Sequence, residues 1–252
     1  MGAAGYRPRF GKDIRIKPDA PVQTHEPRPC SARSCKGEGA FRVPKARDRL
    51  DEHLWFCLEH ARKHNEHWDY FNGMSEAEMA GYKLIIIPGG NSIEIGQSLT
   101  INTASSIRGA VTLYGTHYLG ICAGAFFGGS SIYNGVGLTG GVAFDFYADE
   151  YKGIHIEPVE ITRPNDVPLD VYWQDGPHLS GWGAVVAKFP DGTPAIVQGQ
   201  SGKGFVVFTG VHLEAPETWR GSMIFTTPVD VDLAYAATVF QSALKGTPLP
   251  HF

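Results

Sequence analysis

The chain has 252 residues, of which 42% are hydrophobic, 12% aromatic and 19% charged, with a formal net charge of −4. This composition is typical of a globular protein with a sizeable core, and it excludes a wholly disordered or fibrous chain. Neither the net charge nor the pI of about 6.2 indicates a nucleic-acid partner.

Two further features concern the location of the protein. The longest apolar run, Leu84 to Pro88, is far shorter than a membrane span, and residues 1–20 have no apolar core typical of a signal peptide. Four cysteines are too few for a disulfide scaffold in a chain of this length. We therefore expect a cytoplasmic protein with no membrane partner.

Charge, cysteine and glycine usage all change near Ala80. Residues 1–80 hold 14 Lys and Arg against 12 Asp and Glu, whereas residues 81–252 hold 8 against 14. Three of the four cysteines lie before this point, and glycine is frequent after it. Such a shift indicates a domain boundary. We expect three parts: an extended or disordered arm (1–29), a small zinc-binding module (30–80) and an α/β domain (81–252).

The small module contains four candidate metal ligands. Cys30 and Cys35 form a Cys-x4-Cys pair, and Cys57 and His60 form a Cys-x2-His pair. The segment from residue 48 to about 71 has apolar residues at helical spacing, which predicts a helix with Cys57 and His60 on one face. Four such ligands fit a structural Zn²⁺ site, which would stabilise a piece too short for a core of its own. The alternative is three scattered thiols and a surface histidine.

A longer stretch of the same module resembles a known segment. The run from Phe41 through Met79 is similar to the segment that precedes the J domain in some bacterial DnaJ-like proteins. The J domain itself, with its His-Pro-Asp loop, does not follow. The resemblance therefore implies no co-chaperone activity.

The α/β domain begins with a strand, a helix and a second strand. Residues 82–87 form a short apolar run that is rich in β-branched residues and is stopped by Pro88-Gly89-Gly90, which is typical of a buried strand. Residues 98–114 have apolar side chains at three- and four-residue steps, which predicts an amphipathic helix. A second strand begins at His117. This βαβ order predicts a parallel sheet.

Cys122 follows the second of these strands. It is the centre of Gly120-Ile-Cys-Ala-Gly124, which matches the Gly-x-nucleophile-x-Gly elbow with cysteine in place of serine. The glycines allow a sharp turn from strand to helix, and the N-terminus of a helix favours a thiolate. The alternative is a buried structural cysteine.

A later strand, Gly204 to Gly210, is followed directly by Val211-His212-Leu213-Glu214. In a parallel sheet this strand end and Cys122 would meet at the same edge. They would then supply a nucleophile, a general base and an orienting carboxylate. A lone histidine after a strand is more often an ordinary loop residue than a catalytic base, which is the alternative for His212.

The remaining segments have weaker patterns. Short strands are predicted at residues 154–161, 169–173, 184–189 and 195–198, joined by glycine-containing turns. A closing helix is predicted over residues 230–244, with Leu233, Ala237, Phe240 and Leu244 facing inward. Five side chains are candidates for lining a pocket, with core packing as the alternative for the aromatic ones: Asp145, Tyr147, Tyr172, Trp173 and Trp182.

Together, these residues resemble the class I glutamine amidotransferase-like superfamily, and within it the family of the N-terminal domain of biotin-protein ligases. The resemblance covers residues 82–245 and rests on the stretches Ile87-Pro-Gly-Gly90, Tyr118-Leu-Gly-Ile-Cys-Ala-Gly-Ala125, Gly202-Lys-Gly-Phe and Gly210-Val-His-Leu-Glu214. It implies a parallel-sheet, flavodoxin-like fold. It also implies Cys122 as nucleophile, His212 as base and Glu214 as its orienting acid, with the backbone N–H groups of Gly90 and Ala123 as the oxyanion hole.

The sequence departs from this pattern in three places. Phe126 stands where glutamine-using members have a glutamine, four residues after the nucleophile, and Leu213 replaces the usual proline. Residues 1–80 also supply no apolar strand to precede the Pro-Gly-Gly strand. Three explanations stay open: a shortened sheet, a sheet completed by another chain or by self-association, or a chain that joins pieces of two proteins.

The sequence therefore predicts a cysteine-dependent hydrolase or amidotransferase-like protein that acts on a small amide or acyl substrate through Cys122, His212 and Glu214. The alternative is a non-catalytic binding or assembly protein that keeps the same scaffold.

Overall fold

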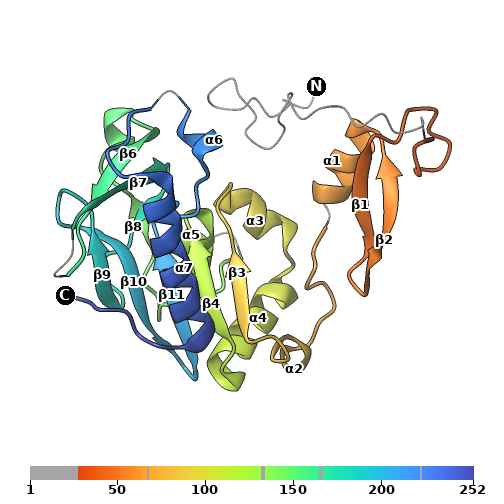
Figure 1. The fold of residues 1–252 in the computed structure, drawn as a ribbon. Coiled ribbons are helices and arrows are strands. Elements are labelled where there is room, and N and C mark those ends of the chain that lie inside the picture. Colours follow the sequence, from red (N-terminus) through yellow and green to blue (C-terminus); the bar gives the residue numbers. More distant parts are fainter. Residues whose placement is uncertain (1–27, 67, 132–133, 165–166, 222) are drawn as a thin grey trace. The chain divides into compact units, whose positions relative to one another are not determined.

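The computed structural model describes residues 28–66, 68–131, 134–164, 167–221 and 223–252 (Figure 1). Most of the arm expected at residues 1–29 thus lies outside the described residues. The described residues divide into two compact units, one that ends at Trp68 and one that begins at Asp69. The second unit includes helix α2 (Glu76–Met79), which comes before the boundary expected near Ala80. No helix in the described part of the chain is long and apolar enough to cross a bilayer.

The first unit is a β-hairpin followed by a short helix. Strands β1 (Phe41–Ala46) and β2 (Arg49–Phe56) pair antiparallel, and α1 (Leu58–Glu66) follows. The helix expected from residue 48 is therefore wrong over its first half, where the chain forms β2. The four-residue spacing of Leu50 and Leu54 misled the prediction, because residues four apart share a face in a strand as well as in a helix. Pairing with β1 decides between the two.

The second unit is built on a five-stranded sheet with the order β3-β4-β11-β10-β9. Strands β3 (Leu84–Ile87), β4 (His117–Ile121) and β11 (Gly204–Thr209) are parallel, as expected. Strands β10 (Pro194–Ser201) and β9 (Ala184–Lys188) are antiparallel, so the sheet is mixed rather than parallel. A two-residue turn at 202–203 joins β10 to β11, and so short a connection can only form a hairpin.

The other elements of the second unit surround this sheet. Helix α4 (Ile101–Gly109) continues into a π-helical turn, so the helix expected over residues 98–114 is present except at Leu99–Thr100, where the Thr100 side chain caps α4. The predicted strands at 154–161 and 169–173 form an antiparallel hairpin. Strands β5 and β8 form a separate two-stranded sheet. The remaining bounds are α3 (Ser92–Ser98), η1 (Ala110–Tyr114), α5 (Ala123–Gly128), β5 (Asp145–Phe146), η2 (Glu150–Lys152), β6 (Ile156–Ile161), β7 (Leu169–Gln174), β8 (Pro177–His178), α6 (Glu217–Arg220) and α7 (Val229–Lys245).

The core lies on both faces of the sheet, because alternate residues of a strand point to opposite sides. On one face, Leu119 and Val207 belong to a cluster covered by α7, which Figure 1 shows lying across β4 and β11. On the other face, Tyr118 and Phe208 pack with Ile107 of α4. The central strands β4 and β11 are thereby fixed from both sides, and both lead into the candidate site.

Helix α7 spans residues 229–245, close to the expected 230–244, but the predicted inward face is wrong. Leu233 is 41% exposed and Phe240 is 37% exposed. The buried residues of α7 are Asp232, Val239, Ser242 and Ala243. A buried acidic residue does not fit an apolar pattern, and Asp232 is inside because it pairs with the buried Arg220.

Candidate active site and candidate metal centre

Cys122 lies at a sharp turn between β4 and α5. Its backbone has φ 50° and ψ −107°, and its N–H donates a hydrogen bond of 2.8 Å to the carbonyl of Thr209 at the end of β11. The turn requires the two flanking glycines. A Cβ on Gly124 would lie 1.9 Å from the carbonyl oxygen of Ile87, and a Cβ on Gly120 would lie 2.4 Å from the carbonyl oxygen of Gly124. The thiol that results is 4% exposed.

His212 and Glu214 follow β11, the parallel neighbour of β4. The Nδ1 atom of His212 lies 2.8 Å from Oε1 of Glu214. Burial alone would lower the pKa of His212, but the charge of Cys122 and hydrogen bonds to Cys122 and Glu214 outweigh it and raise this pKa to about 10. The structure thus brings the three predicted side chains together, with the imidazole between the thiol and the carboxylate.

The turn after β3 borders the same imidazole. A Cβ on Gly89 would lie 2.3 Å from Cε1 of His212, so this position must be glycine if the ring is to keep its place. Gly90, the next residue, has φ 148°, a conformation that favours glycine. Ala123 is the first residue of α5, and the first N–H groups of a helix have no acceptor within it. The oxyanion hole assigned to Gly90 and Ala123 stays a prediction.

Gln174 lies beside the thiol, and Phe126 lies on the helix that follows it. The Cys122 Sγ lies 3.5 Å from the backbone carbonyl oxygen of Gln174, the last residue of β7. Phe126 lies one helical turn after Cys122, and its ring centroid is 5.0 Å from that of Phe146. The position that holds glutamine in glutamine-using members is therefore part of an aromatic pair.

Of the five candidate pocket residues, Tyr172 alone has a ring contact with His212 in the described part of the chain, at 5.8 Å between centroids. Tyr147 and Trp173 are in the core, Trp182 packs against Phe208, and the carboxylate of Asp145 accepts a hydrogen bond from Tyr151. Trp219 on α6 contacts His212 too. No sequence pattern indicates this contact, because a lone tryptophan in a short polar segment has no periodic signal.

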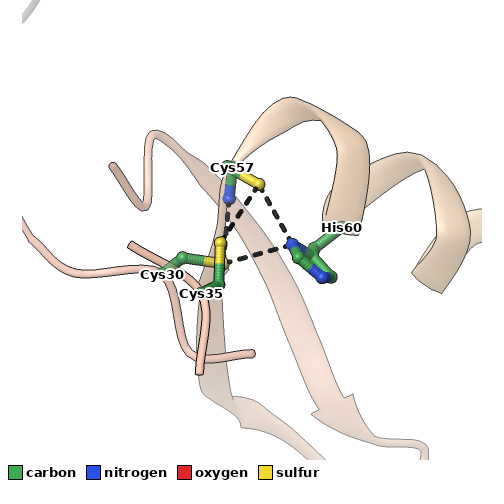
Figure 2. A group of neighbouring side chains, drawn as sticks. All are labelled: Cys30, Cys35, Cys57 and His60. Atoms are coloured by element: carbon green, nitrogen blue, oxygen red, sulfur yellow. Dashed lines mark hydrogen bonds between the residues drawn. The ribbon is translucent and has the colours of Figure 1, made fainter. Parts of the chain in front are cut away.

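The candidate metal centre lies in the first unit, where Cys30, Cys35, Cys57 and His60 converge (Figure 2). Their ligand atoms all lie within 4.8 Å of one another, with 3.1 Å between Cys57 Sγ and His60 Nδ1 and 4.0 Å between Cys35 Sγ and Cys57 Sγ. Sulfur atoms that share a tetrahedral Zn²⁺ lie about 3.8 Å apart, given a bond of about 2.3 Å. The four residues therefore fit a metal ion of this kind.

Local backbone geometry places these ligands. Cys57 directly precedes α1 and His60 lies in its first turn. The two side chains are therefore close together, as predicted, although the residues before Cys57 form a strand and not a helix. Burial alone would raise the pKa of Cys30, but the backbone N–H of Cys57, 3.4 Å from its sulfur, helps to lower it below its usual value. A lowered pKa favours the thiolate, which is the form that binds metal.

A second group of ligand-type side chains lies where β6 begins and β7 ends, and the sequence did not reveal it. The Nδ1 atom of His155 lies 2.7 Å from Glu150 and 2.9 Å from Asp175. Hydrogen bonds to these two carboxylates raise the pKa of His155 above its usual value. We interpret the group as an ion-pair cluster that fixes the turn after Gln174.

Glu157 leads to a prediction on the pH dependence of stability. Burial and the neighbouring Asp149 raise its pKa to about 7. A carboxyl group with a raised folded pKa contributes stability below its unfolded pKa and loses that contribution as the pH rises through about 7. Glu157→Gln should therefore raise the melting temperature at pH 8 by about 2 °C and leave it almost unchanged at pH 5. Glu160→Gln, on the exposed side of the same strand, is the control, and equal shifts at both pH values would contradict the expectation.

The second unit is thus a mixed α/β domain with a cysteine, a histidine and a glutamate grouped at one edge of its sheet. Residues 74–157 match the family model described as "Biotin-protein ligase, N terminal", which confirms the resemblance over this range. The matched range contains Cys122 and ends before His212 and Glu214. The similarity of residues 41–79 to DnaJ-like proteins stays a prediction.

Solved structures also resemble the chain, whereas no curated protein matches it. One is a glutamine amidotransferase with 20% sequence identity and a TM-score of 0.44, covering 55% of this chain and 74% of that chain. Another is the β-galactosidase of the Antarctic haloarchaeon Halorubrum lacusprofundi, with 18% identity and a TM-score of 0.37. That alignment covers 65% of this chain and 22% of the β-galactosidase.

Proposed function

We propose that residues 69–252 form a cysteine-dependent hydrolase or amidotransferase-like domain that acts on a small amide or acyl substrate. The observation that supports this most directly is the place of His212. Its ring lies between Cys122 and Glu214, at the ends of two adjacent parallel strands. In this proposal the domain has a flavodoxin-like amidotransferase fold that lacks its first strands.

The proposed reaction has two halves, formation of a thioester on Cys122 and its cleavage, and His212 transfers one proton in each. The Cys122 thiolate attacks the carbonyl carbon of the substrate, and the electron pair of the C=O bond moves to oxygen. The N–H groups of Gly90 and Ala123 would stabilise this oxyanion, each by about 3–4 kcal/mol. As the tetrahedral intermediate collapses, His212 gives its proton to the leaving group and a thioester forms. His212 then takes a proton from water or from an acceptor amine, whose oxygen or nitrogen bonds to the acyl carbon. The C–S bond breaks, the acid or amide product leaves, and the Cys122 thiolate is restored beside the protonated His212.

The substrate we propose is not glutamine. Glutamine-using members have a glutamine at the position of Phe126, whereas here the Phe126 ring packs against the ring of Phe146. Both rings are half-buried. A substrate that contacts them would have an apolar acyl group, because a polar group against them would lose its hydrogen bonds to water.

We further propose that the ion held by Cys30, Cys35, Cys57 and His60 is Zn²⁺ in a structural role. Three thiolates and one imidazole occupy all four tetrahedral positions, so no position stays open for a substrate. The ion would hold the hairpin and α1 together and take no part in the chemistry of Cys122.

A second candidate function is favoured by the edge of the sheet. Strand β3 has β4 on one side and, within the described residues, no strand on the other, and Ile86 is 40% exposed. An unpaired edge of this kind is a template for another strand. A binding or assembly protein that keeps the scaffold would use this edge, with a partner chain or a second copy completing the sheet.

Alkylation of Cys122 separates the two functions. In the wild type, iodoacetamide should modify Cys122 well below pH 8, as measured by mass spectrometry of the peptide that contains it. His212→Ala should slow the reaction at pH 6 at least tenfold, because the thiolate loses its counter-ion. Glu214→Gln should shift the pH profile upward by a smaller amount. Alkylation of wild-type Cys122 at the rate and pH of a free thiol would leave the binding function as the better account.

A further inference from the structure

The His212 ring is enclosed by two aromatic side chains. Its centroid lies 5.8 Å from that of Tyr172 and 5.8 Å from that of Trp219, with interplanar angles of 78° and 73°. The two aromatic rings also contact each other, again at 5.8 Å. The three rings therefore form a closed triangle, and His212 is 7% exposed within it.

The two aromatic rings reach His212 in different ways. Tyr172 lies in β7, and its carbonyl accepts a 2.8 Å hydrogen bond from the His212 N–H, so the main chain fixes this contact. Trp219 lies on α6, a helix of four residues in the segment between β11 and α7. The N–H of Trp219 donates to the carbonyl of Pro216 within the same segment, so the position of Trp219 depends on how α6 is attached.

A buried ion pair attaches α6 to the rest of the domain. Arg220, the residue after Trp219, is 4% exposed and pairs with Asp232 of α7, which is 1% exposed. The same guanidinium donates a 2.8 Å hydrogen bond to the carbonyl of Thr227 and lies 4.2 Å from the ring centroid of Phe225. These contacts tie the end of α6 to α7 and to the residues that lead into α7. Breaking such a pair is costly, because it leaves an unpaired buried charge.

The arrangement suits a charged imidazole. A buried imidazolium has lost most of its hydration, and the negative face of an aromatic ring within about 6 Å replaces part of that stabilisation. Steep angles between ring planes are typical of edge-to-face contacts, in which the positive edge of one ring meets the negative face of another.

We propose that Trp219 is a positioning residue that holds the His212 imidazolium against Cys122, and that the Arg220–Asp232 pair keeps Trp219 in place. This inference rests on the proposed function, in which His212 acts on Cys122. Trp219 itself does not react. Its effect reaches the thiol through the orientation and charge of His212.

The pH profile of Cys122 alkylation tests this role. Trp219→Ala should move the midpoint upward by about one pH unit, which is about a tenfold slower reaction with iodoacetamide at pH 6. Trp219→Phe keeps an aromatic face and should restore most of the wild-type profile. Trp182→Ala is the control, because Trp182 is a partly buried tryptophan of the same domain that packs against Phe208. This variant should leave the profile unchanged.

Two results would overturn the proposal. An unchanged profile in folded Trp219→Ala would show that His212 is positioned without the indole. An equal shift in Trp182→Ala would show that any loss of packing has the same effect. If Trp219→Ala does not fold, Trp219→Leu replaces it, since leucine fills much of the space without a ring, and the same criteria hold. A wild-type Cys122 that titrates as a free thiol would instead contradict the proposed function, and the role of Trp219 with it.

Discussion

Cys57→Ser is expected to release the metal ion and unfold the hairpin and α1. The described part of the first unit buries very little apolar surface, since its buried hydrophobic residues are Cys30, Val43 and Ala61. A core of this size cannot offset the conformational entropy of about forty ordered residues. In the proposal above, metal binding supplies the difference, since structural zinc sites contribute about 10–16 kcal/mol at neutral pH. Losing one of four ligands should therefore abolish both binding and folding of this unit.

Metal analysis and proteolysis test this expectation together. The wild type should contain one zinc per chain, and Cys57→Ser should contain none and be cut rapidly between residues 28 and 66. Cys122→Ser is the matched control, because it also removes one thiol but lies in the other unit and should keep the metal. A metal-free wild type that resists proteolysis would mean that packing alone holds α1 against the hairpin.

Gly124→Ala should destabilise the second unit by about 3 kcal/mol or more. The added Cβ would lie 1.9 Å from the carbonyl oxygen of Ile87. This oxygen belongs to the main chain of β3 and cannot move aside as a flexible side chain would. Strand β3 and helix α5 must then separate, and the turn that carries Cys122 moves with them. Chemical denaturation followed by tryptophan fluorescence gives the change in the free energy of unfolding.

Gly81→Ala provides the comparison for this measurement. Its Cβ would lie 3.2 Å from the carbonyl oxygen of Glu78, a contact that a small shift relieves, so it should cost well under 1 kcal/mol. If Gly124→Ala proved as stable as Gly81→Ala, the close approach of α5 to β3 would be wrong, and with it the geometry of the elbow.

The parts of the fold that the sequence predicts well are those with a local cause. The run at residues 82–87 is apolar and ends at Pro-Gly-Gly, and β3 lies within it. The predictions that failed depend on partners far along the chain. Residues 49–56 form a strand because β1 pairs with them. Helix α7 buries the side that carries Asp232, because Asp232 pairs with Arg220. Neither partner is visible in the pattern of the segment itself.

The candidate site divides in the same way. Cys122, His212 and Glu214 were predicted because glycine spacing and strand order place them at one sheet edge, and their side chains lie together in the structure. Trp219 and the Glu150–His155–Asp175 cluster were missed, because such contacts follow from tertiary packing and leave no periodic signal. The Cys-x4-Cys and Cys-x2-His spacings predicted that these four side chains lie together, although the helix predicted around Cys57 was wrong over its first half.

The order of strands in the mixed sheet has a consequence for how the domain folds. Strands β9, β10 and β11 are consecutive in the chain and joined by short turns, so their pairing closes only small loops. The pairing of residues 118–121 with residues 206–209 closes a much longer loop, which contains about half of the domain. Contacts of long sequence separation form slowly. We expect the β9–β11 meander to form early and Cys122 to meet His212 late, so that the thiol acquires its counter-ion in one of the last steps of folding.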